Sequence, residues 1–298
     1  MNKKLAFSLI ELSIVILIIG ILVAGVTQSS RLVAQMRLAS AQSVTRSADI
    51  SSIRDMVFWA ETSLESSITN SAGSLQIEDG NSVSSWNDIN PQISAKINVT
   101  QATAANQPTY KASGINGLPS LSFNGSNQTL SNTSAIPLPA SDKNYSLVIV
   151  WRANTVSSTD ARQLIGQGTN PPTFDRLGSI VLLNGGSIGF SGWANNFFPT
   201  SVSVNNNYIN IVTVNNTLST NNISVYTNSN TAVIGSSNNP ANLNLGAQLF
   251  FIGGDGTNAG YFFSGLISEA IVFDRTLKSD EVKSVNAYLG KKYGIKIP

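Results

Sequence analysis

An apolar run at the start of the chain constrains the fold more than any other feature. Residues 7–26 are apolar almost throughout and are about long enough to cross a bilayer as one helix. Lys3 and Lys4 precede the run, and their charges are expected to stay on the cytoplasmic side. Glu11 interrupts the run near its beginning. Because a charge in the bilayer interior costs roughly 2.5–3.5 kcal/mol on insertion scales, we interpret Glu11 as a functional residue.

The leader and the beginning of this run resemble the N-terminal segment of type IV prepilins and pseudopilins. In that family a small residue precedes Phe-Thr-Leu-Ile-Glu and a hydrophobic helix; here Ala6 precedes Phe7-Ser-Leu-Ile-Glu11. Ala6 stands where the family usually has Gly. An ordinary secretory signal differs, because its cleavage site follows the apolar core. The resemblance implies that a membrane prepilin peptidase cuts between Ala6 and Phe7 and that Phe7 becomes N-methylated.

The same resemblance implies assembly with other pilin subunits through the N-terminal helix. A lone carboxylate at the depth of Glu11 needs a partner, and the natural one is the amine of Phe7 in a neighbouring subunit. Before assembly the chain is expected to span the inner membrane once, with the bulk of it outside the cytoplasm.

Composition removes several kinds of chemistry. The chain has no cysteine and no histidine, which excludes disulfides, thiol nucleophiles, Cys or His zinc sites and His-dependent triads. Charged residues are sparse at 11%, the net charge is +2, and the basic residues are spread along the chain. Since nucleic-acid binding needs a clustered basic face, no nucleic-acid partner is expected.

The helical pattern continues beyond the apolar run. Apolar residues recur at spacings near 3.6 as far as Ile53, which predicts one helix from about 7 to about 57, roughly 75 Å long. The recurring positions are Leu32, Val33, Met36, Ala39, Val44, Ala48 and Ile53. We therefore divide the chain into a leader (1–6), a pilin-like helix (7–57, transmembrane over 7–26) and a head (58–298).

The head has the pattern of an antiparallel β-sandwich. Short strand-like runs alternate with turns rich in Gly, Asn, Pro and Ser, and no helical pattern separates them. The clearest runs are 145–152, 179–183, 208–214, 223–226, 248–253 and 266–273. A short helix is predicted at the C-terminal end, with Ser279 as its N-cap and Gly294 as its stop. The predicted class is mainly β: a long helix, a sandwich and a short final helix.

The head resembles the concanavalin A-like, laminin G-like jelly-roll family over about residues 58–298. Three stretches carry the likeness: Val83–Tyr110 with its Trp86-Asn-Asp88, Ile115–Gly125, and Gly260–Ile295. The resemblance implies a jelly roll and a choice among sugar binding, adhesion and a structural role. A shared fold does not by itself supply the function.

Enzymes on this fold that cleave glycans use paired carboxylates, and a retaining pair lies about 5–5.5 Å apart. None of the six glutamates, at positions 11, 61, 65, 78, 269 and 281, lies in a Glu-x-Asp-x-Glu pattern. Glu61 and Glu65 are predicted in the connection after the long helix. Glu269 and Asp274 would point to opposite faces of one strand. The sequence therefore predicts a head that is not an enzyme.

Two further patterns concern ligands of the head. Asp79, Asp88 and Asp255 lie in predicted loops without the spacing of a Ca²⁺ site, so turn formation is favoured and no cofactor is predicted, with bound Ca²⁺ as the alternative. The segment 192–199 places aromatic rings beside amides, the groups that sugar recognition uses. Its candidate glycan-binding residues are Trp193, Asn195, Asn196 and Phe198, while core packing of Trp193 and Phe197 is the alternative.

These observations favour a prepilin-like subunit of a type IV pilus or a type II secretion-like pseudopilus. Its head would serve adhesion or contact a polysaccharide. A membrane-anchored glycan-binding protein that does not polymerise is one alternative, and a surface-anchored glycoside hydrolase is the other.

Overall fold

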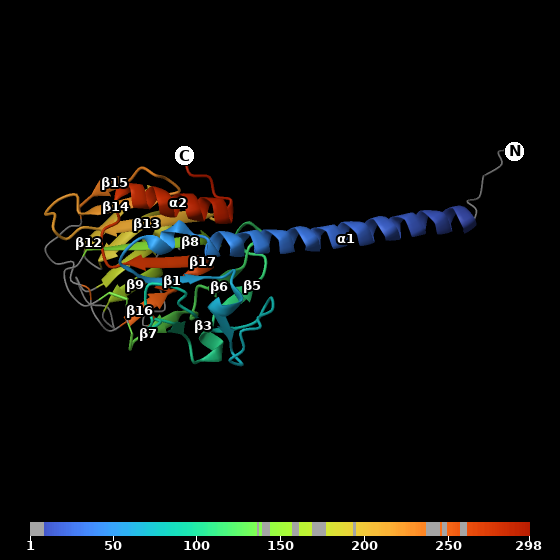
Figure 1. The fold of residues 1–298 in the computed structure, drawn as a ribbon, viewed down its shortest axis with the longest axis horizontal. Coiled ribbons are helices and arrows are strands. Elements are labelled where there is room, and N and C mark those ends of the chain that lie inside the picture. Colours follow the sequence, from blue (N-terminus) through green and yellow to red (C-terminus); the bar gives the residue numbers. More distant parts are fainter. Residues whose placement is uncertain are drawn as a thin grey trace.

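The computed structural model describes residues 9–298 except 136, 139–143, 157–160, 169–176, 193–194, 237–244, 246–248 and 257–260. The described chain forms a long helical stem, α1, that projects from a β head (Figure 1). The head carries a short C-terminal helix, α2, so the predicted fold class is confirmed.

The stem α1 spans Leu9–Arg46. Its side chains are exposed over most of its length, and only its last turns are covered by the head, where Ala41 and Thr45 are buried. The helix ends before the predicted limit near residue 57. Ala48 is extended (φ −70°, ψ 119°), and the chain turns there because Ile50 and Ile53 are buried in the head.

The described strands form two antiparallel sheets. The first contains, in spatial order, β15 (Val233–Gly235), β14 (Ile223–Thr227), β13 (Tyr208–Val214), β8 (Tyr145–Ala153), β17 (Ser264–Phe273), β6 (Ser120–Asn124) and β5 (Thr109–Lys111), with β1 (Met56–Glu61) also paired to β17. The second contains β12 (Asn195–Ser201), β11 (Ser187–Gly192), β10 (Leu177–Leu182), β9 (Arg162–Gly168), β16 (Leu249–Ile252), β7 (Leu130–Asn132), β4 (Val99–Thr100), β3 (Val83–Trp86) and β2 (Ile68–Asn70). The connections contain the 3₁₀ turns η1 (Asp49–Ser52), η2 (Glu65–Ser67), η3 (Ala104–Asn106), η4 (Ile115–Gly117) and η5 (Asn184–Gly186).

The main core lies between the two sheets, and a second core lies on the other side of the first sheet. Strand β8 shows why both exist. Leu147, Ile149 and Trp151 face the inter-sheet core. Val148 and Val150, which alternate with them, face the second core, where the sheet is covered by α2, η1 and the end of α1. A strand buried on both faces reads as a continuous apolar run, as this one does.

Helix α2 spans Ser279–Tyr293 and lies over the first sheet (Figure 1). Its N-cap is Lys278 and not Ser279, so the predicted cap was wrong by one residue. The reason is that Glu281 accepts a hydrogen bond from the backbone N–H of Lys278 (2.8 Å) and is held by Arg275 (2.6 Å). Gly294 ends the helix as predicted, in the left-handed region at φ 62°.

Candidate functional site

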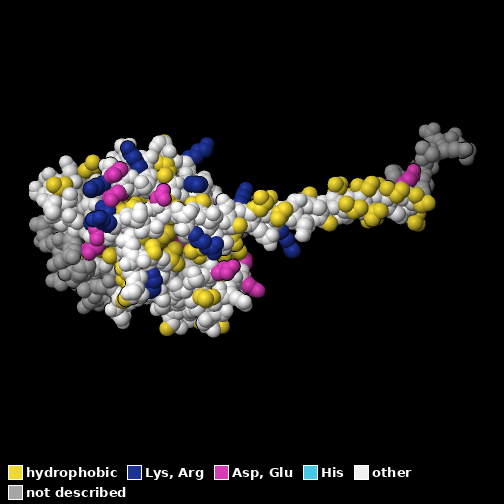
Figure 2. All heavy atoms as spheres, in the orientation of Figure 1, with side chains coloured by type: hydrophobic (Ala, Val, Ile, Leu, Met, Phe, Trp, Pro, Cys, Tyr) yellow, Lys and Arg dark blue, Asp and Glu magenta, His cyan; other side chains and the backbone are white. Residues whose placement is uncertain are grey.

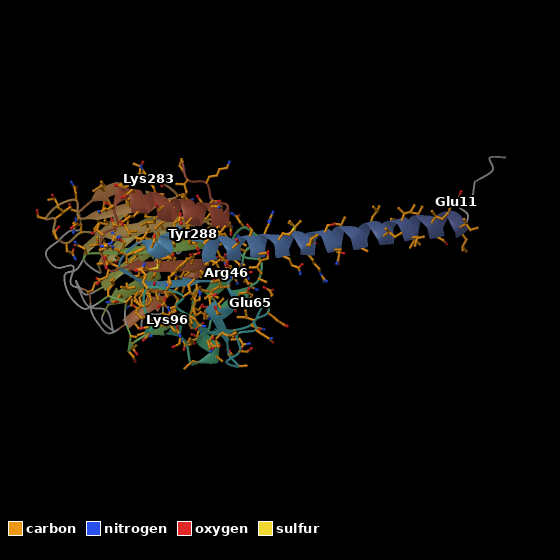
Figure 3. The ribbon with its side chains drawn as sticks, viewed as in Figure 1. Glu11, Arg46, Glu65, Lys96, Lys283 and Tyr288 are labelled. Atoms are coloured by element: carbon orange, nitrogen blue, oxygen red, sulfur yellow. The ribbon has the colours of Figure 1, made fainter. Side chains whose placement is uncertain are left out.

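The stem is the first candidate site. Its apolar side chains are exposed along the part that projects from the head (Figure 2). Within the described residues one helix is long and apolar enough to cross a membrane, and it is this one. Glu11 lies in its first turn, at the end opposite Tyr288 and the head (Figure 3). Ala6 and Phe7 lie outside the described residues.

The second candidate is a buried charge cluster beneath α2, formed by Glu61, Glu269 and Lys292. Glu61 of β1 and Glu269 of β17 are directly opposite each other in the antiparallel ladder. Lys292 of α2 reaches between them, and its Nζ lies 2.7 Å from Oε2 of Glu61 and 2.8 Å from Oε2 of Glu269. The side chains of all three residues are exposed by 1% or less.

Hydrogen bonds satisfy both carboxylates of the charge cluster. Glu269 accepts from the indole N–H of Trp59 (2.7 Å) and from the hydroxyls of Tyr288 (2.8 Å) and Tyr293 (2.9 Å). Glu61 accepts from the backbone N–H groups of Ser63 and Leu64, at 2.7 and 2.6 Å. Buried charges persist when they are paired and hydrogen-bonded in this way.

Two effects set the ionisation of the charge cluster. Burial by itself would raise the pKa of Glu61, but the charge and hydrogen bond of Lys292, together with hydrogen bonds from Ser63 and Leu64, outweigh burial and hold that pKa below its ordinary value. Burial would likewise lower the pKa of Lys292, but Glu269 and Glu61 raise it above its ordinary value. Lys292 and Glu61 are therefore both charged at neutral pH.

The charge cluster joins elements that are distant in sequence. Strands β1 and β17 supply the carboxylates and α2 supplies the lysine. The Tyr288 hydroxyl lies 3.4 Å from that of Thr45 in the stem, and Gln42 of the stem donates to the carbonyl of Ser63 (2.9 Å). The cluster therefore helps to fix the stem and α2 on the sheet. Because both carboxylates are sealed from solvent, this glutamate pair is not an open site for a glycan.

Sequence reasoning missed the charge cluster. It placed Glu61 in a connection, whereas the structure places it in strand β1. It compared Glu269 only with Asp274 and placed the two on opposite faces of one strand, whereas the residue opposite Glu269 is Glu61, more than 200 residues away in the chain. One signal was present: Lys292 continues the apolar stripe of α2 at helical spacing after Leu289, which predicts a buried lysine.

The third candidate is a cavity on the second sheet. It has a volume of about 190 Å³ and includes Asn196 and Phe198 of β12, two of the predicted glycan-binding residues. Phe197, between them, packs against the main core. Trp193 lies outside the described residues, as does the side chain of Asn195. The rest of the lining is Ala161, Gln163, Val181, Leu183, Ser191 and Tyr261, which sequence reasoning did not select.

Asp88 and Asp79, two of the three aspartates in the loops where a Ca²⁺ site was considered, have local roles. Asp88 is buried and accepts hydrogen bonds from the backbone of Trp59 (3.0 Å) and Asn90 (2.9 Å). Burial raises the pKa of Asp88. Asp79 accepts from Ala112 N–H (2.8 Å) in an exposed turn. In the described part of the chain no three Asp, Glu, His or Cys residues are grouped as metal ligands would be.

Comparison with known proteins supports the interpretation of the N-terminus. Residues 1–27 match the model of the prokaryotic N-terminal methylation motif. The motif implies processing by a prepilin peptidase and assembly with other pilins. With the exposed apolar stem it supports a membrane-anchored, pilus-type protein. No curated protein matches the chain.

Solved structures with similar folds include glycan-active enzymes. A GH54 α-L-arabinofuranosidase soaked with a cyclic sulfate inhibitor has a TM-score of 0.61 at 14% identity, over 83% of this chain and 65% of that one. An arabinofuranosidase complexed with arabinofuranosyl-α-1,2-xylobiose has a TM-score of 0.60 at 13% identity, with the same coverage. Trypanosoma rangeli sialidase in complex with sialic acid has a TM-score of 0.51 at 16% identity, over 80% of this chain.

The chain spans only a third of the sialidase (33%) and just under two thirds of the arabinofuranosidases. At these identities the likeness shows the fold alone. Because this fold occurs in glycoside hydrolases, it contradicts the prediction that the head is not an enzyme. That prediction relied on a local pattern of carboxylates, and the pair formed by Glu61 and Glu269 shows that strand pairing can bring together glutamates with no such pattern.

Proposed function

We propose that the chain is a prepilin-like subunit of a type IV pilus or a type II secretion-like pseudopilus, and that its head contacts a glycan. The observation that carries the first part is the methylation motif at residues 1–27, continued by an exposed apolar helix. Cleavage between Ala6 and Phe7 exposes an amine at the membrane end of the stem, close in sequence to Glu11.

Glu11 is assigned an assembly role. A carboxylate in an apolar filament core is stabilised by a positive partner, and the amine of Phe7 in a neighbouring subunit supplies that charge. Glu11→Ala removes the acceptor and leaves the amine buried and unpaired, at a cost of about 3–5 kcal/mol. We expect the variant to insert in the membrane normally and to be depleted from sheared filaments, as measured by immunoblot of membrane and filament fractions.

The matched control is Ser13→Ala, in the same part of the stem, which removes only a hydroxyl bonded to the carbonyl of Leu9 (2.7 Å). It should assemble like the wild type. Normal incorporation of Glu11→Ala would count against the pilin proposal. It would favour the alternative, a membrane-anchored glycan-binding protein that does not polymerise.

The glycan part of the proposal is supported by the fold of the head, which is shared with enzymes that act on carbohydrate. Its test is a glycan array probed with the full chain in detergent micelles. The absence of binding to any glycan would remove this part and leave a structural head. Incubation of the same protein with bound oligosaccharides and an assay for released reducing sugar tests the second candidate, a surface-anchored glycoside hydrolase, which the fold neighbours favour.

A further inference from the structure

We propose that the cavity on the second sheet, lined by Phe198 and Tyr261 together with Gln163, Ser191 and Asn196, binds one ring of a neutral sugar. This inference rests on the proposed glycan contact and assigns it to a place and to a ligand class. Four adjacent strands and one connection build the cavity: β9, β10, β11, β12 and the segment that holds Tyr261.

Strand alternation explains why these side chains share one face. In β10, Ile180 and Leu182 point into the core between the sheets, so Val181 points the other way. Ser191 and Asn196 are directly opposite in the β11–β12 ladder and therefore lie on the same face. The cavity thus lies on the face of the sheet away from the inter-sheet core.

The polar groups of the cavity are held in place. Ser191 donates a hydrogen bond to Oδ1 of Asn196 (2.9 Å). Oε1 of Gln163 accepts from the backbone N–H of Asp255 (3.0 Å), and Gln163 is only 2% exposed. Groups that are already oriented lose less entropy when a ligand binds.

The lining matches the chemistry of a neutral sugar. An amide offers both donors and acceptors, and a hydroxyl offers both as well, which suits the hydroxyl groups of a sugar. The rings of Phe198 and Tyr261 supply flat apolar surface for the C–H face of a sugar ring. Among the described lining residues none carries a charge at neutral pH, so nothing there would compensate the carboxylate of an acidic sugar.

The size of the cavity limits the ligand to one ring. Drug-sized ligands occupy clefts of roughly 300–1,000 Å³. A volume of about 190 Å³ is below that range and suits a single unit at the end or side of a longer glycan. Affinity for one unit would be weak, and several heads along one filament would strengthen attachment by multivalency.

The test uses the full chain in detergent micelles on an array of neutral hexose and pentose oligosaccharides together with sialylated ones. Phe198→Ala should weaken binding to neutral glycans about three- to tenfold, the loss expected for one aromatic contact. Phe198→Leu keeps bulk but removes the ring and should weaken binding similarly. Asn196→Ala should weaken it through loss of the amide.

The matched control for Asn196→Ala is Asn206→Ala, an exposed asparagine in the connection between β12 and β13. Asn206→Ala should bind glycans like the wild type. Every variant that is compared should have the same thermal unfolding temperature as the wild type, so that loss of binding does not reflect loss of folding. If Phe198→Ala unfolds, Phe198→Leu and Asn196→Ala still test whether the glycan binds in the cavity.

Three results would overturn the cavity assignment. Binding by the wild type that neither Phe198→Leu nor Asn196→Ala weakens would place the glycan elsewhere and leave the proposed function standing. Binding restricted to sialylated glycans would contradict the neutral ligand class. No binding by the wild type would remove the proposed glycan contact itself, and the cavity assignment with it.

Discussion

At the scale of single residues, Lys292 makes two buried ion pairs. Its ammonium lies between two carboxylates that share one ladder position, and all three side chains are shielded from water. Replacing a complete buried ion pair by apolar residues is often neutral, whereas removing one partner costs about 3–5 kcal/mol because a buried charge is left uncompensated.

Lys292→Met should therefore lower the free energy of unfolding by about 3–5 kcal/mol at neutral pH. The loss should be smaller in acid, where Glu61 becomes neutral by protonation. Chemical denaturation at several pH values measures both effects. Lys291→Met is the matched control, because Lys291 is the exposed neighbour of Lys292 on α2, and it should change stability little. Equal effects of the two substitutions would contradict the role given to the cluster.

The wild-type pH profile follows from the same pKa directions. The lowered pKa of Glu61 gives stability that is present above the ordinary value of 4.5 and is lost as pH falls through the folded-state value. The raised pKa of Lys292 gives stability that is present below the ordinary value of 10.5 and is lost as pH rises through the folded-state value. We expect Glu61 and Lys292 to contribute most to the free energy of unfolding between those two pH limits. In Lys292→Met this contribution should be absent from the plot of stability against pH.

At the scale of elements, the joint between stem and head depends on close approach of α1 and the head. Ala41 is 2% exposed there, and Thr45 and Gln42 make the polar contacts. Ala41→Asp places a charge in this apolar contact and should release the end of the stem from the head while the stem stays helical.

Hydrogen exchange measures this release. In Ala41→Asp, the amides of residues 41–46 should exchange faster than in the wild type, because the helix loses its packing partner. Ser43→Asp is the control, since Ser43 is exposed on the same turn of α1. If these amides exchange at the wild-type rate in Ala41→Asp, the joint tolerates the charge. Other contacts then hold the stem on the head.

The sequence predicted local elements well and contacts between distant elements poorly. Strand β13 has the predicted bounds Tyr208–Val214, and α2 buries Val282, Val285 and Leu289 as its periodicity indicates. The stem ends at Arg46 because burial of Ile50 and Ile53 overrides a periodicity that continues beyond it. Alternation along β12 places Asn196 and Phe198, two of the predicted glycan-binding residues, on one face of the strand. The cavity also needs residues of the neighbouring strands, and the sequence of one segment does not predict which strands pair with it.

At the scale of the whole molecule, the chain combines two different parts, an exposed apolar stem and a β head. The stem carries the methylation motif and the head a fold shared with glycan-active enzymes. A stem whose large apolar side chains are mostly more than half exposed is not stable alone in water, so a bilayer or neighbouring subunits must cover it. We therefore expect a membrane intermediate and an assembled form with the same stem.

Processing at the N-terminus tests the pilin proposal most directly. Intact-mass analysis and N-terminal sequencing of the protein, isolated from a host with an active prepilin peptidase, should show a chain that begins at Phe7 and carries one extra methyl group. Ala6→Lys, which places a large charged residue at the cut, should leave the leader attached. A wild-type chain that retains Met1 in that host would contradict the account.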